Sequence, residues 1–323
     1  EWYQGTADAV RKQIFEIQSA RTQYVLILAG DHLYNMDYSK MAEFHWKTNA
    51  DITVAVQPVP KSEASRFGIL KRDSDFRIID FSEKPKEEQV LASMVSRDDK
   101  EKPYLGSMGI YLFNLKTLVD VLSLDNKAHD LDDFGGDIIP YAIKNNASVY
   151  GYDFNGYWRD IGTIRSFYET NLALAEADPP FNLYDQQFKI FTHPRFLPGS
   201  RLNDCRIKNV LIAEGCCIEQ ADIEHSVIGV RSQIGSGTRI KDTVMIGADY
   251  YNPRGDNPIG IGKNCDIEGA IIDKNVCLGD NVIIKPFPPD FETDHYLYNV
   301  REGVVVIPKN KVIPSGTVIK PED

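Results

Sequence analysis

Hydrophobic residues in the first part of the chain follow a helical spacing and then form a short continuous run. The spacing predicts a helix over residues 6–17, with Thr6 placed to cap it and Asp8 in its first turn. The run Tyr24–Leu28 predicts a buried strand, and an unbroken apolar strand implies cover on both faces of its sheet. Asp31 follows this strand, at the carboxyl end where open α/β sheets bind ligands.

The same alternation of helical and strand patterns continues to residue 177. It predicts helices over residues 38–48, 116–124, 138–144 and 164–177, and strands over residues 52–57, 68–71, 77–81, 109–113 and 149–154. Alternating elements of this kind indicate the α/β class. Asp178-Pro179-Pro180 then ends the last helix, because proline cannot continue a helix.

Beyond residue 199 the hydrophobic period changes to six residues. Ile228, Ile234, Ile240 and Ile246 are spaced by six, and glycine follows three of them at positions 229, 235 and 247. The step recurs at Ile212, Ile218, Ile261, Ile267, Ile272, Leu278, Ile284, Ile307, Ile313 and Ile319. Hexapeptide repetition predicts a parallel β-helix whose inward aliphatic residues stack between coils. Residues 249–257 and 286–298 lack the period, and we expect them to be loops that leave the coil.

These patterns divide the chain into an α/β domain at residues 1–178, a linker at 179–198 and a β-helix at 199–323. A chain of 323 residues with 42% hydrophobic content can form two such cores. Its net charge of -11 repels polyanions, so we expect neither nucleic acid nor an anionic membrane as a partner. No apolar run approaches the roughly 18 residues of a membrane-spanning helix. The five cysteines are expected to be buried, reduced thiols rather than zinc ligands or disulfides.

Acidic and basic side chains follow several of the predicted strands. Asp31, Asp160 and Lys84 suit a transferase that joins a nucleoside triphosphate to a sugar phosphate, which needs carboxylates for a divalent cation and a fixed cation for phosphate. By spacing alone, each residue has a structural interpretation as well. Asp31 and Asp160 would cap a turn and a helix, and Glu83 with Lys84 would be a solvated charge pair.

Six segments together are more specific than any single residue. They are WYQGTADAV (2–10), LAGDHLY (28–34), FSEKP (81–85), SMGIY (107–111), DFG (133–135) and YWRDIGT (157–163), and IIDKN (271–275) and IPSGT (313–317) extend the series. In this order they closely resemble the glucose-1-phosphate adenylyltransferase (ADP-glucose pyrophosphorylase) family. The resemblance implies a nucleotidyltransferase-type, Rossmann-like mixed sheet domain followed by a left-handed parallel β-helix. It also implies Mg²⁺-dependent conversion of ATP and glucose 1-phosphate to ADP-glucose and pyrophosphate, the committed step of glycogen or starch synthesis.

The resemblance assigns roles to individual residues. Asp31 and Asp160 would hold the metal ion and, with Lys84, carry the catalysis. The residues implied to bind glucose 1-phosphate are Tyr3, Gly68, Glu83, Lys84, Ser107 and Asp133, with Phe134 and Asp137 near the sugar. Lys274 and Lys309 would bind an anionic activator such as 3-phosphoglycerate or fructose bisphosphate. Family members are tetramers, and a homotetramer and a heterotetramer both stay open. The location would be the cytoplasm in a bacterium or the plastid stroma in a plant or alga.

One departure from the family pattern leaves alternatives open. No glycine-rich triphosphate-binding segment occurs in the sequence, so we expect a fragment that is inactive alone, or a naturally shortened homologue. A transferase that uses UTP or dTTP and a non-catalytic regulatory subunit are the alternatives within the family. A hexapeptide acyltransferase is an alternative of another class, and it would need a histidine base in a coil loop. His193, His225 and His295 lie in that half, and His225 in the repeat favours a structural role.

Overall fold

The computed structural model describes residues 2–124, 131–180, 182–186, 189–251 and 258–322. The chain divides into two compact units. The first unit comprises Glu1–Gly30 and Tyr34–Trp158, and the second comprises Asp31–Leu33 and Arg159–Asp323. The predicted boundaries at residues 178 and 199 follow sequence patterns instead, and they stay a prediction.

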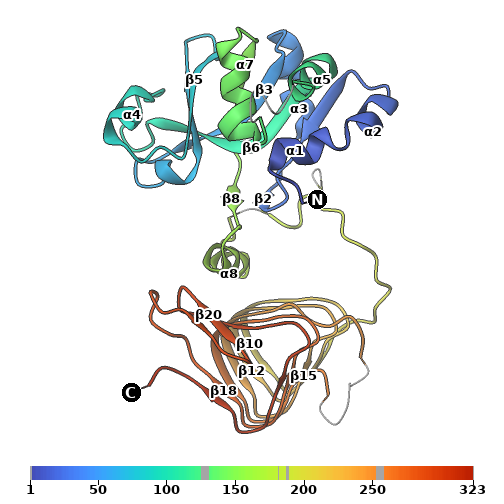
Figure 1. Cartoon of the computed structure of the whole chain (residues 1–323). Coiled ribbons are helices and arrows are strands. Elements are labelled where there is room, and N and C mark those ends of the chain that lie inside the picture. Colours follow the sequence, from blue (N-terminus) through green and yellow to red (C-terminus); the bar gives the residue numbers. More distant parts are fainter. Residues whose placement is uncertain (1, 125–130, 181, 187–188, 252–257, 323) are drawn as a thin grey trace. The chain divides into compact units, whose positions relative to one another are not determined.

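A six-stranded mixed sheet forms the centre of the first unit (Figure 1). The strands run in the order β5 (Ile78–Glu83), β4 (Gly68–Arg72), β6 (Tyr104–Asn114), β3 (Ile52–Val59) and β7 (Val149–Asp153), and β1 (Tyr24–Ile27) also pairs with β6. β3 and β7 are parallel, whereas the other pairs are antiparallel. The predicted α/β class is confirmed, and β6 extends farther than the predicted strand because residues 104–107 also pair with β3 or β4.

Helices cover both faces of this sheet. They are α1 (Thr6–Arg11), α2 (Ile14–Ser19), α3 (Tyr38–Lys47), η1 (Ala64–Arg66), α4 (Glu88–Ser93), α5 (Leu115–Leu122), η2 (Phe134–Ile138) and α7 (Ile139–Lys144). Ile52, Val54 and Val56 of β3 pack with α5 and α7, whereas Ala55 packs with α3 on the opposite face. β1 likewise contacts both cores, through Val25 and Ile27 on one side and Tyr24 and Leu26 on the other. The predicted two-sided cover of β1 is therefore confirmed, but its four residues are only half-buried and Leu28 is 44% exposed, so the prediction of a buried strand over Tyr24–Leu28 is wrong.

The start of the chain differs from the prediction. The single helix expected over residues 6–17 is two helices, and Gly5 rather than Thr6 is the N-cap residue of α1. The Thr6 hydroxyl is not available for a local cap because it donates to Asp133 Oδ2 at 2.8 Å and accepts from Phe134 N at 3.0 Å. A contact far along the chain has replaced the local one.

A short two-stranded sheet and one helix lie outside the six-stranded sheet. β2 (His32–Tyr34) pairs with β8 (Trp158–Asp160), and α8 (Ile164–Ala173) begins shortly after β8. The Thr163 side chain caps α8 by accepting from Ser166 N at 3.1 Å. α8 is shorter than the predicted helix over 164–177, and it belongs to the second unit.

The rest of the second unit is a parallel β-helix (Figure 1). Its strands are β9 (Arg201–Asn203), β10 (Arg206–Ile212), β11 (Cys217–Glu219), β12 (Asp222–Ile228), β13 (Gln233–Ile234), β14 (Arg239–Met245), β15 (Gly260–Ile261), β16 (Asp266–Ile272), β17 (Cys277–Leu278), β18 (Ile283–Ile284), β21 (Val304–Ile307), β22 (Val312–Ile313) and β23 (Val318–Ile319). Aliphatic residues pair in register from coil to coil, as in the column Ile223, Ile240, Ile267, Ile284 and Ile319. All five are fully or almost fully buried, so the predicted β-helix is confirmed.

One residue was wrongly assigned to the inward positions of the predicted repeat. The column through Ile228 and Ile272 contains Met245, not Ile246. Met245 is buried in the coil interior, whereas Ile246 is half-buried in a separate cluster that includes α8. The spacing shortens from six to five residues between Ile240 and Met245, because inward positions are set by strand pairing and not by a fixed count.

The two segments that were predicted to leave the β-helix as loops are described to different extents. The insert predicted at 286–298 carries β19 (Thr293–Asp294), which pairs antiparallel with β20 (Asn299–Arg301), and β20 pairs antiparallel with β21. Of the predicted loop at 249–257, residues 252–257 lie outside the described residues. The five cysteines are free thiols: Cys216, Cys265 and Cys277 are buried, and Cys205 and Cys217 are half-buried.

Candidate functional site

Asp31 and Asp160 come together at Gly162 in the second unit. Pairing of β2 with β8 places the two aspartates near each other, and Ile161 N donates to the Asp31 carbonyl at 2.9 Å. A Cβ on Gly162 would lie 3.0 Å from Asp160 Oδ1 and 3.1 Å from Asp31 Oδ2. Each carboxylate therefore turns one oxygen toward the same point. Gly162 N also donates to Asp160 Oδ1 at 2.8 Å, which fixes that carboxylate.

The Asp31 and Asp160 carboxylates suit a hard cation that also binds oxygen atoms of other molecules. Mg²⁺ is commonly bound by one or two carboxylates, with phosphate oxygens and water in the other positions. Within the described ranges, no group of three or more His, Cys, Asp or Glu side chains is arranged to hold a metal ion. Asp31 and Asp160 fit Mg²⁺ as two carboxylate ligands. Further ligands would come from the substrate and solvent.

A second group of predicted residues surrounds the Glu83 carboxylate in the first unit. Glu83 ends β5 and pairs with Gly68 of β4. A Cβ would lie 2.8 Å from Glu83 Oε2 if added to Gly68 and 2.9 Å if added to Gly135. Burial raises the pKa of Glu83, Lys84 opposes this shift, and Asp133 adds to it. The carboxylate is therefore held between two glycines that leave it room.

Lys84 extends from the same strand end into solvent. Its side chain is 63% exposed, and its ammonium group faces the carboxylate of Glu83, at 3.6 Å between Lys84 Nζ and Glu83 Oε1. The backbone adopts the left-handed region, with φ of 44°, and Lys84 N donates to the Phe67 carbonyl at 3.2 Å. The ammonium group at this turn is accessible from solvent, so a phosphate group could pair with it.

Ser107 occupies a buried position on β6. Its hydroxyl accepts from Gly109 N at 3.2 Å and also hydrogen-bonds to Tyr111. Burial raises the pKa of Tyr111 to about 12, opposed by the Ser107 hydrogen bond and reinforced by the charges of Asp133 and Glu83. Ser107 and Tyr111 therefore belong electrostatically to the group around Glu83.

Asp133 has a structural role that the sequence left open. It is the N-cap residue of η2, and its Oδ1 accepts from Gly136 N at 2.8 Å. Its Oδ2 accepts from the Thr6 hydroxyl, so both oxygens have protein partners. The Asp137 carboxylate accepts from the backbone N–H of Asp132 and Asp133, which stabilises the same turn. Binding of the sugar by Asp133 stays a prediction.

Tyr3 lies at the exposed start of the chain. Its side chain is 58% exposed, and the Lys12 ammonium lies 5.1 Å from the centre of its ring. The structure thus places Tyr3 next to α1. It does not pair Tyr3 with any other predicted site residue among those described.

Sequence reasoning missed three residues that shape these groups. Gly135 and Gly162 leave room for carboxylates, and Thr6 hydrogen-bonds to Asp133. Gly135 lies in DFG and Gly162 in YWRDIGT, so the signal was a glycine within each of these motifs. A glycine is recognisable as a site residue only when the neighbouring side chain is known.

Two family models match the chain, and curated relatives are similar to it. The model described as "Nucleotidyl transferase" matches residues 1–177, and the model described as "GLGC left-handed parallel beta-helix domain" matches residues 195–318. The small subunit of glucose-1-phosphate adenylyltransferase, chloroplastic/amyloplastic, of Triticum aestivum is 43% identical in an alignment of 341 residues, which covers 99% of this chain and 71% of the relative. The chain belongs to the glucose-1-phosphate adenylyltransferase family.

The two lysines that the family resemblance assigned to an activator lie beside one carboxylate. Lys274 Nζ is 3.0 Å from Asp249 Oδ1, and Lys309 Nζ is 3.6 Å from Asp249 Oδ2. Hydrogen bonds from Lys274 and Asn275 lower the pKa of Asp249 to about 2, and the charges of both lysines contribute. In this member of the glucose-1-phosphate adenylyltransferase family, the predicted pair is therefore one cluster of two cations and one anion. Its role in effector binding stays a prediction.

The histidines do not favour the acyltransferase alternative in this adenylyltransferase family member. His225 Nδ1 lies 2.5 Å from Asp242 Oδ1, and its Nε2 lies 3.6 Å from Glu176 Oε1. The His295 ring packs at a tilted angle against the rings of Tyr296 and Tyr298. The predicted structural role of His225 agrees with these contacts. Among the described residues, no helix is long and apolar enough to cross a membrane.

Proposed function

We propose that this protein transfers the adenylyl group of ATP to glucose 1-phosphate, forming ADP-glucose and pyrophosphate for glycogen or starch synthesis. The observation that carries the proposal is family membership along nearly the whole chain, together with the two groups of polar residues described above. A 43% identical relative that bears this activity in its name supports ATP over UTP or dTTP.

Phosphoryl-type transfer depends mainly on positioning and charge stabilisation, and the chain supplies both. The accessible Lys84 ammonium would pair with the phosphate of glucose 1-phosphate. Glu83 would accept hydrogen bonds from sugar hydroxyls, and Gly68 keeps the space beside that carboxylate open. Ser107, Asp133 and Tyr3 complete the set that we propose for the sugar phosphate.

Asp31 and Asp160 are the residues that would hold Mg²⁺. When bound, the ion would offset negative charge on the phosphoryl groups. The chain's own contribution is the placement of the two aspartates: the Gly162 backbone N–H donates to the Asp160 carboxylate, and the Ile161 backbone N–H donates to the Asp31 backbone carbonyl. Asp133 caps a helix, and both of its carboxylate oxygens have protein partners. Asp31 and Asp160 differ from Asp133 in this respect.

The name of the same relative supports a proposal about assembly and location. It is named a small subunit and is chloroplastic/amyloplastic. This name favours a heterotetramer over a homotetramer, and the plastid stroma over a bacterial cytoplasm, for the present protein. The cluster of Lys274, Lys309 and Asp249 would bind the anionic activator, with the phosphate of the activator replacing Asp249 as partner of the lysines.

The direct test is pyrophosphate release from glucose 1-phosphate and Mg²⁺, with ATP, UTP, dTTP and GTP supplied in turn. It compares this chain with a version extended by the family's glycine-rich triphosphate segment, and with the extended version carrying Asp31→Asn. We expect ATP to be strongly preferred by the extended chain and Asp31→Asn to be inactive. Preference for another nucleotide would exclude the ADP-glucose assignment, and an inactive extended chain would favour the regulatory subunit.

A further inference from the structure

The β-helix carries a second aliphatic column, which faces outward. Val227, Val244, Ile271 and Val306 are in register on β12, β14, β16 and β21. They alternate with the inward column, so solvent would normally cover them. Val244 and Ile271 are nevertheless only 1% and 5% exposed, because they cluster with Tyr168 and Leu172 of α8. The outward column is thus a docking surface for α8, and Ile246 belongs to it.

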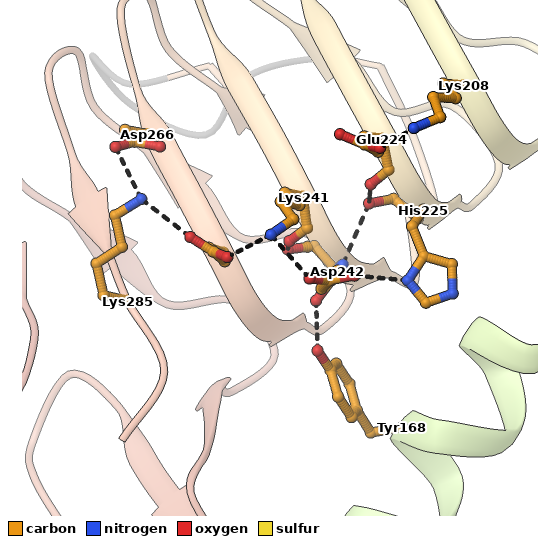
Figure 2. Close-up of polar contacts among 11 residues, drawn as sticks. Tyr168, Lys208, Glu224, His225, Lys241, Asp242, Asp266 and Lys285 are labelled. Atoms are coloured by element: carbon orange, nitrogen blue, oxygen red, sulfur yellow. Dashed lines mark hydrogen bonds and ion pairs between the residues drawn. The ribbon is translucent and has the colours of Figure 1, made fainter. Parts of the chain in front are cut away.

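Polar contacts fix the position of α8 on this surface (Figure 2). The Tyr168 hydroxyl donates to the Asp242 carbonyl at 2.6 Å. The Asp242 carboxylate in turn contacts His225 Nδ1 at 2.5 Å and Lys241 Nζ at 3.6 Å. His225 and Asp242 occupy equivalent places in neighbouring coils, since both lie in the left-handed region, with φ of 43° and 44°, between register pairs. Asp242 is therefore held by groups from two coils.

The far end of α8 and its start are also attached to the β-helix. Glu176, just beyond α8, lies 3.6 Å from His225 Nε2. Arg165, in the first turn, donates to the Glu302 carbonyl at 3.1 Å. A helix with side-chain contacts at its start, middle and end has little freedom to tilt or slide.

The start of α8 is joined directly to the carboxylate pair. The Ser166 hydroxyl donates to the Asp160 carbonyl, and Gly162 N donates to Asp160 Oδ1 at 2.8 Å. Ile161 N continues the chain of hydrogen bonds to the Asp31 carbonyl. The second unit therefore contains one connected path from the β-helix through α8 to both aspartates.

We propose that α8 anchors the Asp31 and Asp160 carboxylates to the β-helix, and that Tyr168 is a positioning residue for them. The inference rests on the proposed function for the metal-binding role of the two aspartates. It goes beyond that function because it assigns the β-helix a part in shaping the metal site. Tyr168 acts through α8, and it does not touch the aspartates itself.

The test measures Mn²⁺ binding to the substrate-free chain by electron paramagnetic resonance, alongside amide hydrogen exchange of residues 160–166. Tyr168→Phe removes one hydroxyl, and the matched control is Tyr184→Phe, whose side chain is 76% exposed in the linker. Loss of this part-buried hydrogen bond is expected to weaken Mn²⁺ binding about 2- to 10-fold and to raise amide exchange at residues 160–166. Tyr184→Phe should match the wild type in both measurements.

A further variant separates positioning from general destabilisation. Ile313→Val removes a methyl group from the coil interior, away from α8, and lowers the melting temperature without touching the path. If Ile313→Val weakens Mn²⁺ binding as much as Tyr168→Phe does, or if Tyr168→Phe leaves both measurements unchanged, the anchoring role is wrong. Asp31→Asn and Asp160→Asn test whether the two aspartates bind the metal ion. Unchanged Mn²⁺ binding in both would overturn the metal assignment, whereas hydrogen exchange would still decide whether α8 anchors residues 160–166.

Discussion

The Glu83 carboxylate lies against the α-carbon of Gly135, so close that a Cβ there would be 2.9 Å from Glu83 Oε2. Such a distance is shorter than an ordinary contact, and one of the two groups must move. The space beside Glu83 is therefore a property of Gly135, which lies far along the chain from β5.

Gly135→Ala should displace Glu83 from its position. Because a lost hydrogen bond between a charged group and substrate costs about 1.5–3 kcal/mol, we expect the KM for glucose 1-phosphate to rise about 10- to 100-fold in the pyrophosphate-release assay described above. Gly136→Ala is the matched control, since its Cβ would meet Asp133 at an ordinary 3.7 Å. Equal KM values for the two variants would contradict the role of Gly135.

Gly162→Ala should disturb both metal-binding carboxylates at once. The new Cβ would press on Asp160 Oδ1 and Asp31 Oδ2, and it would change their shared orientation. We expect Mn²⁺ affinity to fall about 10- to 100-fold, as for changes that reorient ligands without removing them. Gly30→Ala, next to Asp31 but with nothing within 4 Å of its Cβ, should bind Mn²⁺ like the wild type.

Met245→Ala should destabilise the β-helix much more than Ile246→Ala. Met245 is 3% exposed within the coil, so its truncation leaves a cavity and costs about 2–5 kcal/mol. Ile246 is half-buried against α8, and its truncation should cost less. Urea unfolding of the two variants measures the difference, and a larger loss for Ile246→Ala would show that our register for this coil is wrong.

Asp249→Asn should strengthen binding of an anionic activator. The substitution leaves Lys274 and Lys309 without their shared carboxylate, and an activator phosphate would then have less competition. Because exposed ion pairs contribute about 0.2–1 kcal/mol, we expect the activator concentration at half-maximal effect to fall up to about fivefold. Glu219→Gln, which removes a carboxylate paired with Arg201 elsewhere on the β-helix, is the control. An unchanged activator response in Asp249→Asn would argue against this cluster as the effector site.

The pH dependence of stability should reveal the buried Glu83. Its pKa is raised in the folded chain, so the folded chain binds this proton more tightly than the unfolded chain does. The resulting stability is fully present below the unfolded pKa of about 4.3 and is lost as pH rises through the folded pKa. Glu83→Gln should therefore gain melting temperature relative to the wild type as pH rises from about 4.3 through the raised pKa of Glu83. A constant difference across this range would contradict the shift.

Most of the fold was predictable because local patterns specify it. The six-residue period marked the β-helix, since aliphatic side chains must stack in every coil, and the alternation before residue 177 marked the α/β sheet. The failures occurred where a distant contact replaced a local one. Thr6 bonds to Asp133 instead of capping α1, and Met245 takes the inward place assigned to Ile246.

By itself, the sequence determined the architecture, the family and the residue types of the candidate site, because these are carried by periodicity and by short ordered motifs. Only the tertiary structure decided which side chains share a point in space. Asp31 and Asp160 lie far apart in the chain, and β2–β8 pairing turns both toward Gly162. The aliphatic column under α8 likewise resembles ordinary strand sequence. It is a docking surface because the strands are in register and a helix packs against them. The local spacing of hydrophobic residues specifies neither of these.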